Sequence, residues 1–194
     1  MKHLLFLFLL IGNYAIAQIP ALPEQVSPLL IGEQIPEAEL KSAGNTTHQL
    51  SEILAEKPSI LLFYRGGWCP YCNAHLSEIQ EAEREIIELG YQIVAISPDA
   101  PENLKITEDD KSIRYQLYSD ADGQLIKAMG IAFKAPEQYS GMLSEKSGGL
   151  NKGILPVPSV FVVSPSGKIQ FEYINPDYST RLSGKLLLAI LKNM

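Results

Sequence analysis

The sequence predicts an α/β protein with a central mixed β-sheet flanked by helices on both faces. Apolar, strand-like segments alternate with helical segments along most of the chain, and a strand–turn–strand pattern followed by one more helix ends it. The alternation indicates parallel strands joined by helices, whereas the final hairpin adds antiparallel strands. The length of residues 18–194 suits one domain with a sizeable core.

The first elements are expected to be short. Residues 18–28 contain three prolines and are predicted to be an extended lead-in. A hairpin is expected over residues 37–50, with Gly44-Asn45 as its turn. Ser51 is a suitable N-cap for a short helix that reaches Glu56 and ends before a proline.

The central elements carry the strongest patterns. Residues 59–64 are apolar on both faces, which is typical of a buried central strand. A long helix is expected from about Pro70 to Gly90, because apolar residues recur at helical spacing within it. Residues 91–97 read as the next strand.

The remaining segments complete the alternation. In chain order they are a helix over 101–110, a short strand over 116–118, a short helix over 123–129, a loop over 136–153, a hairpin formed by 159–163 and 168–173, and a final helix capped by Ser183 and reaching Leu191.

The two cysteines of the chain stand together in Trp68-Cys69-Pro70-Tyr71-Cys72, where the central strand gives way to the long helix. Two thiols at this spacing can close a small disulfide and reopen it. Unpaired N–H groups and the macrodipole at a helix start favour a thiolate, so Cys69 is expected to have a lower pKa than Cys72. The motif predicts a redox-active pair.

Two other interpretations of the pair are less favoured. A structural zinc site needs four ligands, and here both thiols would have to converge with His48 and His75. A purely structural disulfide would close a loop too short to constrain the unfolded chain much. We therefore expect neither a metal nor another cofactor.

Residues 1–17 have the features of a secretory signal peptide. Lys2 and His3 form a basic start, residues 4–11 are apolar, and Ala15-Ile16-Ala17 is an A-x-A cleavage signal. The apolar run is shorter than the roughly 20 residues that span a bilayer, so no stable membrane anchor is expected. If the source is a Gram-negative bacterium, the protein is expected in the periplasm, or else secreted.

The charge of the chain argues against a nucleic-acid partner. Without Lys2, residues 18–194 hold 15 basic against 22 acidic side chains, a net charge of −7. No basic patch is apparent.

The motif and its surroundings resemble the thioredoxin fold. Trp68-Cys69-Pro70-Tyr71-Cys72 follows a buried strand, and Pro158 heads a second strand, residues 159–163, that precedes Gly167-Lys168-Ile169. In that fold the proline at this place follows a cis bond and faces the two thiols. The resemblance therefore implies a cis bond before Pro158 and contact between Pro158 and the thiols.

A narrower resemblance covers about residues 32–191. Three segments, 63–72, 118–123 and 175–178, are similar to peroxiredoxin-like members of the alkyl hydroperoxide reductase and thiol-specific antioxidant family. The long span between Cys69 and Pro158 also fits this family better than a minimal thioredoxin. The resemblance implies a single thioredoxin-like domain over residues 18–194.

The chain departs from this family at two places. Family members carry a threonine three residues before the peroxidatic cysteine and an arginine across from it. If Cys72 is aligned with that cysteine, Cys69 takes the place of the threonine and Pro158 that of the arginine. Arg65 is the nearest candidate replacement, although it could equally be a solvent-facing arginine at a strand end.

The resemblance implies a thiol-based antioxidant enzyme that cycles Cys69 and Cys72 between dithiol and disulfide. Its substrate would be a hydroperoxide and its reductant a thioredoxin-type dithiol protein. Arg65, Trp68, Pro70 and Pro158 would support the site, with Trp68 shielding the thiols and Pro70 restricting the helix start. Two alternatives stay open: a disulfide reductase acting on protein disulfides, and a binding module that has kept the fold.

Overall fold

The computed structural model describes residues 18–194, so the predicted signal peptide, residues 1–17, lies outside the described residues. A seven-stranded sheet has the strand order β2-β1-β5-β4-β3-β8-β9, and β6 and β7 form a separate two-stranded ribbon. Strands β3, β4 and β5 are parallel to one another, and the other pairings are antiparallel. The predicted mixed sheet is confirmed.

The strands are β1 (Glu39–Ser42), β2 (Thr47–Gln49), β3 (Ser59–Phe63), β4 (Gln92–Ser97), β5 (Gln116–Ser119), β6 (Ala132–Lys134), β7 (Ile154–Pro156), β8 (Ser159–Val163) and β9 (Ile169–Ile174). The α-helices are α1 (Leu50–Ala55), α2 (Pro70–Glu88), α3 (Pro101–Lys111), α4 (Gln124–Ala128), α5 (Ser140–Lys146) and α6 (Gly184–Leu191). Two short 3₁₀ turns, η1 (Pro23–Gln25) and η2 (Glu137–Tyr139), complete the described elements.

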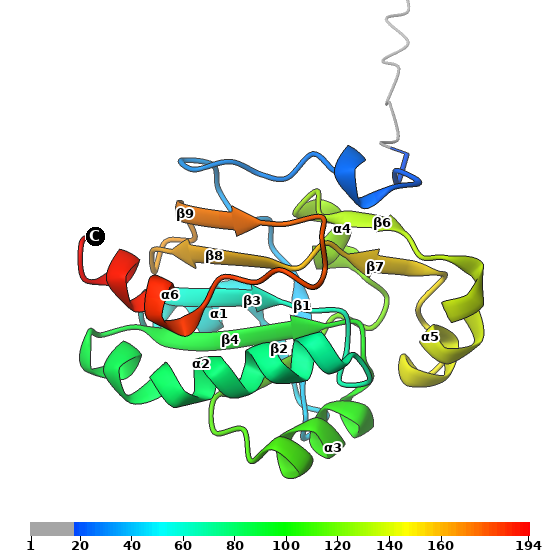
Figure 1. Ribbon diagram of the computed structural model, residues 1–194, viewed down its shortest axis with the longest axis horizontal. Coiled ribbons are helices and arrows are strands. Elements are labelled where there is room, and N and C mark those ends of the chain that lie inside the picture. The colour runs from blue at the N-terminus through cyan, green and yellow to red at the C-terminus, as the bar shows by residue number, and fades with distance from the viewer. Residues whose placement is uncertain (1–17) are drawn as a thin grey trace, which may run out of the picture.

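Strand β3 lies inside the sheet, between β4 and β8, and is buried along its whole length. Ile60 and Leu62 point into a core cluster shared with α2, α3 and α6, whereas Leu61 and Phe63 point into a second cluster shared with α1 and α4. Helices therefore cover both faces, as expected, and Figure 1 shows α2 and α6 on the same side of the sheet. This explains why the strand is apolar on both faces from Ile60 to Phe63.

Parallel pairing places the segments after β3 and β4 at the same edge of the sheet. Ser59 pairs with Gln92 and Phe63 with Ile96, and the amide of Tyr64 continues the ladder by donating to the Ile96 carbonyl at 3.0 Å. The residues that follow β3 thus emerge beside those that follow β4. This edge holds the cysteine motif.

Two details of the predicted secondary structure are wrong. Gln49, not Ser51, caps α1, and its amide donates to Glu52 Oε2 at 3.5 Å. The segment 136–153 is not a loop throughout, because it contains η2 and α5. Helix α5 has a single buried apolar residue, Leu143, so it shows no helical periodicity in the sequence.

The bond before Pro158 is also different from the expectation. No peptide bond in residues 18–194 is cis, so this bond is trans, which is the isomer that an X–Pro bond favours unless packing opposes it. Pro158 is buried and directly precedes β8, whose Ser159 pairs with Phe63 at the end of β3. It therefore lies at the sheet edge that holds the cysteine motif. Contact with the thiols stays a prediction.

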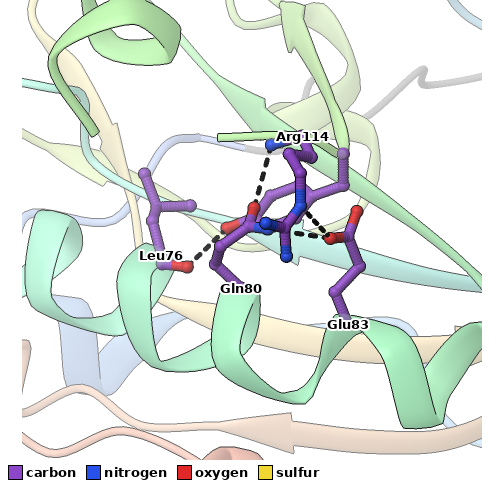
Figure 2. Close-up of polar contacts among 5 residues, drawn as sticks. Leu76, Gln80, Glu83 and Arg114 are labelled. Atoms are coloured by element: carbon purple, nitrogen blue, oxygen red, sulfur yellow. Dashed lines mark hydrogen bonds and ion pairs between the residues drawn. The ribbon is translucent and has the colours of Figure 1, made fainter. Parts of the chain in front are cut away.

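Helix α2 is fastened to the start of β5 by a polar cluster (Figure 2). Gln80 Oε1 accepts a hydrogen bond from the Arg114 amide at 2.9 Å, and Glu83 Oε2 lies 2.9 Å from Arg114 Nε. The Tyr115 hydroxyl donates to the Leu76 carbonyl at 2.8 Å. These bonds fix α2 along the face of the sheet.

Among residues 18–194, no helix is long and apolar enough to cross a membrane.

We expect Glu83→Ala to lower the free energy of unfolding by about 1–3 kcal/mol, because Glu83 is buried and its loss leaves Gln80 Nε2 and Arg114 Nε without their acceptor. Glu88→Ala is a matched control on the same helix, since Glu88 pairs only with the exposed Arg84 at 3.7 Å. It should cost less than about 0.5 kcal/mol beyond any change in helix propensity. Urea unfolding measures both values, and equal losses would contradict the role given to the cluster.

Candidate active site

The cysteine motif occupies the turn from β3 into α2. Cys69 is the N-cap residue of α2 and Pro70 its first residue, which suits a proline because that position lacks a helical partner for an N–H group. Gly66, with φ of 140°, makes the turn possible. A side chain there would overlap the Trp68 indole and crowd the Asp99 carboxylate.

Both thiols are reduced and buried, with Cys69 1% and Cys72 0% exposed. Hydrogen bonding from the Cys72 side chain lowers the pKa of Cys69 to about 6, assisted by the Cys72 amide and by Arg65 and Arg181. Burial and the Cys69 sulfur raise the pKa of Cys72. The predicted order of the two pKa values is confirmed. Cys69 is thus the more acidic of the two thiols.

Arg65 is buried rather than solvent-facing. Its guanidinium carbon lies 4.4 Å from the ring centre of Tyr178, 5.0 Å from that of Trp68 and 5.4 Å from that of Tyr139. Three aromatic faces can hold a cation in this way without neutralising it. The positive charge therefore remains available to a thiolate at Cys69.

A second arginine reaches the motif from the segment before α6. Arg181 Nη2 lies 3.5 Å from Cys72 Sγ, while its Nε donates to the Tyr178 carbonyl at 2.8 Å. The neighbouring segment is braced from both sides, because the Asn175 amide donates to the Pro158 carbonyl at 3.3 Å and His75 Nε2 bonds the Leu182 carbonyl at 2.9 Å. The arginine is therefore held over the thiols.

Unpartnered polar atoms gather around the motif. In residues 18–194, six buried side-chain nitrogen or oxygen atoms have no hydrogen-bond partner, and five belong to residues at or near the thiols: Tyr64, Arg65, Trp68, Asn73 and Arg181. Buried polar groups are normally satisfied, so such a concentration marks a place where function rather than stability decides the residues.

Asp99 adds a buried carboxylate to the same place. It follows β4, and its Oδ2 accepts a hydrogen bond from the Gly67 amide at 2.7 Å. Burial raises the pKa of Asp99 to about 6, although the Gly67 amide and Lys146 oppose the rise. A cavity of about 150 Å³ adjoins the carboxylate and is also lined by Trp68 and Asn73.

Of the other residues considered in the sequence, Trp68 and Pro70 lie in the motif, whereas His48 lies on a distant strand. Trp68 packs on Tyr139 at 5.5 Å between ring centres and covers the motif on that side, and Pro70 is exposed at the helix start. His48 lies on β2, the far edge strand, where it packs on Tyr118. No group of three or more His, Cys, Asp or Glu side chains in the described residues could hold a metal ion.

Sequence reasoning missed Arg181, Asp99 and Tyr139. Asp99 could have been found, because it follows the strand next to the one that precedes the cysteines, and parallel strands end at one edge. Arg181 lies 109 residues from the thiol that it contacts. Tyr139 belongs to the segment expected to be a loop. No local pattern pointed to either residue.

The geometry defines a class of protein: a thioredoxin-fold oxidoreductase with a dithiol at the start of a helix. The sequence matches the AhpC/TSA family over residues 31–172, and the chain belongs to that family. The resemblance to peroxiredoxin-like proteins is thereby confirmed, and the chain is a thiol-dependent oxidoreductase enzyme.

Individual relatives agree with the family. The chain is 28% identical over 106 residues to a putative peroxiredoxin, bcp, of Haemophilus influenzae, which covers 55% of this chain and 68% of the relative. It is 25% identical over 168 residues to the thiol-disulfide oxidoreductase ResA of Oceanobacillus iheyensis, covering 84% of this chain and 75% of the relative.

Solved structures support the fold. The crystal structure of reduced Prx3 from Vibrio vulnificus in complex with hydrogen peroxide superposes with a TM-score of 0.72 at 18% identity, covering 84% of this chain and 99% of that one. The predicted thioredoxin-like fold is confirmed.

We expect Cys72→Ala to raise the pKa of Cys69 above its value of about 6, because the substitution removes the hydrogen-bond donor with the largest effect on that thiol. Cys72→Ser, which keeps a donor, is the matched control and should retain a lower pKa than the alanine variant. The rate of iodoacetamide labelling against pH measures each value. Faster labelling of Cys72 at low pH, tested in Cys69→Ser, would reverse the assignment of the nucleophile.

Proposed function

We propose that this protein is a thiol peroxidase that reduces hydroperoxides through Cys69 and Cys72 and is restored by a thioredoxin-type dithiol protein. The observation that carries the proposal is the convergence of two arginine side chains, the buried Arg65 and the half-buried Arg181, on two buried thiols. Similarity to peroxiredoxins supports the substrate class and the type of reductant.

The two arginines can supply the positive charge that stabilises the transition state of a peroxide reaction. When a thiolate attacks the O–O bond, negative charge develops on the departing oxygen, and fixed positive groups nearby stabilise that charge. Arg65 and Arg181 both lower the pKa of Cys69 and have buried nitrogen atoms without partners. Those nitrogen atoms can donate hydrogen bonds to the oxygen atoms of a bound peroxide. If Cys72 is aligned with the family's peroxidatic cysteine, Pro158 stands where the family has its arginine, and Arg65 and Arg181 would take over the role of that arginine for either thiol.

The reaction that we propose has two steps. The Cys69 thiolate attacks one peroxide oxygen, the O–O bond breaks, and an alcohol or water leaves as Cys69 becomes a sulfenic acid. Cys72, already hydrogen-bonded to Cys69, then attacks the sulfenic sulfur. The S–O bond breaks, water leaves, and the Cys69–Cys72 disulfide forms. Both cysteines belong to the first turn of α2, so the second step joins neighbouring side chains.

The alternative function is a disulfide reductase without significant peroxidase activity. The CxxC spacing and the similarity to ResA favour it. The burial of Cys69 argues against it, because a protein disulfide cannot reach a sulfur that is 1% exposed unless the covering side chains move. Hydrogen peroxide is small enough to need much less opening. The reductant must also open the site, and the exposed Tyr71 and Tyr178, packed together at 5.5 Å, lie where it would approach.

We also propose that the protein is exported, to the periplasm or outside the cell, after cleavage behind Ala17. The proposal rests on the basic start, the apolar run and the A-x-A signal of residues 1–17. In such a compartment the Cys69–Cys72 disulfide would persist until a dedicated donor reduces it.

Arg181→Met should slow the reaction of reduced protein with hydrogen peroxide by about 100-fold, since one donor to a developing oxyanion is typically worth that much. Arg65→Met should act in the same direction. Arg114→Met is the control, because Arg114 lies on the polar cluster of Figure 2, away from the thiols. Stopped-flow fluorescence of Trp68, the one tryptophan of the chain, follows the reaction.

Cys69→Ser should abolish the peroxide reaction, whereas Cys72→Ser should leave the first step intact and stop at sulfenic or sulfinic acid, detected by mass spectrometry. If wild-type protein reacts with peroxide no faster than a free thiol, yet reduces protein disulfides readily, the peroxidase proposal is wrong and the disulfide reductase replaces it.

Export is tested by expressing the full chain in a Gram-negative host and fractionating the cells. We expect the protein in the periplasm or medium with Gln18 as its N-terminal residue, read by mass spectrometry of the intact protein. Replacing Ala15 and Ala17 by bulky residues should block cleavage. Recovery of uncleaved wild-type protein from the cytoplasm would contradict the proposal.

A further inference from the structure

We propose that Asp99 and Asn73 act as positioning residues, by holding the glycine turn that leads from β3 into α2 in one geometry. The turn joins Arg65 to Cys69, so its geometry sets how the guanidinium stands relative to the attacking sulfur. This role rests on the proposed function, in which that guanidinium assists a peroxide reaction. Both side chains bond the backbone of the turn, so neither has to exchange a proton with a thiol.

The turn needs support from outside, because two consecutive glycines lie in it. Gly66 and Gly67 directly follow Arg65, and Gly66 has a φ of 140°, which residues with side chains rarely adopt. Glycine loses more conformational freedom on folding than any other residue, so a Gly-Gly pair does not by itself stay in one conformation. Within the turn, the Cys69 amide donates to the Gly66 carbonyl at 3.2 Å. The two polar backbone groups of Gly67 take no part in that bond.

Two side chains hold those two groups of Gly67. Asp99, in the segment after β4, accepts a hydrogen bond from the Gly67 amide at its Oδ2, at 2.7 Å. Asn73, in the first turns of α2, donates from Nδ2 to the Gly67 carbonyl at 2.8 Å. The Asn73 amide also donates to the Cys69 carbonyl at 3.0 Å, so one residue bonds both the glycine turn and the start of the helix. Gly67 is thus held between the end of β4 and α2.

Packing against α3 confines the turn on another side. Thr107 lies so close to Gly67 that a Cβ on this glycine would overlap Thr107 Oγ1. Thr107 is itself held, because its Oγ1 donates to the Asn103 carbonyl at 3.0 Å. A residue stiffer than glycine therefore does not fit at this position, and the turn depends on the two hydrogen bonds of Gly67 for its rigidity.

The unpartnered oxygen of Asn73 supports a role in function rather than in stability. Asn73 Oδ1 is buried and has no hydrogen-bond partner, which costs folding free energy. An apolar residue would avoid that cost but would leave the Gly67 carbonyl without its donor. Asp99 is similar, because its carboxylate is 2% exposed and burial raises its pKa to about 6, although the Gly67 amide opposes the rise. Both residues therefore cost stability, and both bond the same glycine.

The two hydrogen bonds matter for the reaction because the turn links two groups that must act together. Three aromatic rings hold the Arg65 guanidinium, but these contacts do not fix the position of Cys69. The backbone between the two residues does. Attack on a peroxide requires the sulfur, the O–O bond and the stabilising charge to be aligned, and a displacement of about 1 Å can lower the rate about 100-fold.

The test removes each hydrogen bond separately. Asp99→Ala removes the acceptor of the Gly67 amide, and Asn73→Ala removes the donor to the Gly67 carbonyl. Each should slow the reaction of reduced protein with hydrogen peroxide by about 100-fold. Each should also raise the pKa of Cys69 from about 6 by about one unit, because Arg65 is no longer fixed beside the thiolate. Asp99→Asn keeps an oxygen for the Gly67 amide and should restore most of the rate and the lower pKa, although it cannot serve as an acid or a base.

Asn103→Ala is the matched control. Asn103 lines the same cavity as Asn73, and its Nδ2 also donates to a backbone carbonyl, that of Lys146 at 2.9 Å, but it does not bond the turn. Asn103→Ala should lower the free energy of unfolding to a similar extent as Asn73→Ala, measured with urea, without changing the peroxide rate or the pKa of Cys69. In a protein with both Asp99→Ala and Asn73→Ala, the two effects should be less than additive, because either loss already frees the turn.

Iodoacetamide labelling against pH gives the pKa of Cys69 without peroxide, so the result is readable even if the peroxidase proposal fails. An unchanged pKa in both alanine variants overturns the proposal, and so does an equal loss of rate in Asn103→Ala. If Asp99→Asn is as slow as Asp99→Ala, the charge of Asp99 matters rather than its hydrogen bond, and its role as a positioning residue is wrong. If Asp99→Ala does not fold, Asn73→Ala and Asp99→Asn decide the outcome by the same measurements.

Discussion

The parallel pairing of β3 with β4 is the constraint on which the rest of the site depends. Because the two strands run in the same direction and register, the turns that follow them emerge together at one edge. One turn carries the cysteines into α2, and the other carries Asp99 to the Gly67 amide. The burial of β3 on both faces holds this edge rigid, since neither turn can move without disturbing two core clusters.

The surroundings of Cys69 and Cys72 give these two chemically identical thiols different pKa values. Cys69 has the Cys72 thiol, the Cys72 amide and two arginines within reach, which all favour its thiolate. Cys72 lies one turn into the helix, where burial favours the neutral thiol. The order suits the proposed cycle, in which the first sulfur attacks a substrate and the second resolves the intermediate. The five residues with unpartnered polar atoms around the pair fit this view, because a site shaped for stability alone would have satisfied them.

The covering of the thiols comes from segments far apart in sequence. Trp68 belongs to the motif, Tyr139 to the turn before α5, and Tyr178 and Arg181 to the approach to α6. Arg65 at their centre ties these segments to one another through cation–π contacts rather than ion pairs. Its charge is thus positioned without being cancelled. Such a cover admits a small oxidant more readily than a folded protein.

The sequence by itself determined the elements whose patterns are local: the buried strand β3, the helix after the cysteines, the closing hairpin, and the place of the two cysteines at the start of that helix. Apolar periodicity and turn residues suffice for these. The lower pKa of Cys69 was also predicted, but its largest cause, the Cys72 thiol, is seen only in the structure. Only the tertiary structure decided that Arg65 is buried, that Arg181 and Asp99 join the site, and that η2 contributes Tyr139. Those outcomes depend on contacts between residues distant in the chain, which strand pairing and packing create and which no spacing along the sequence records.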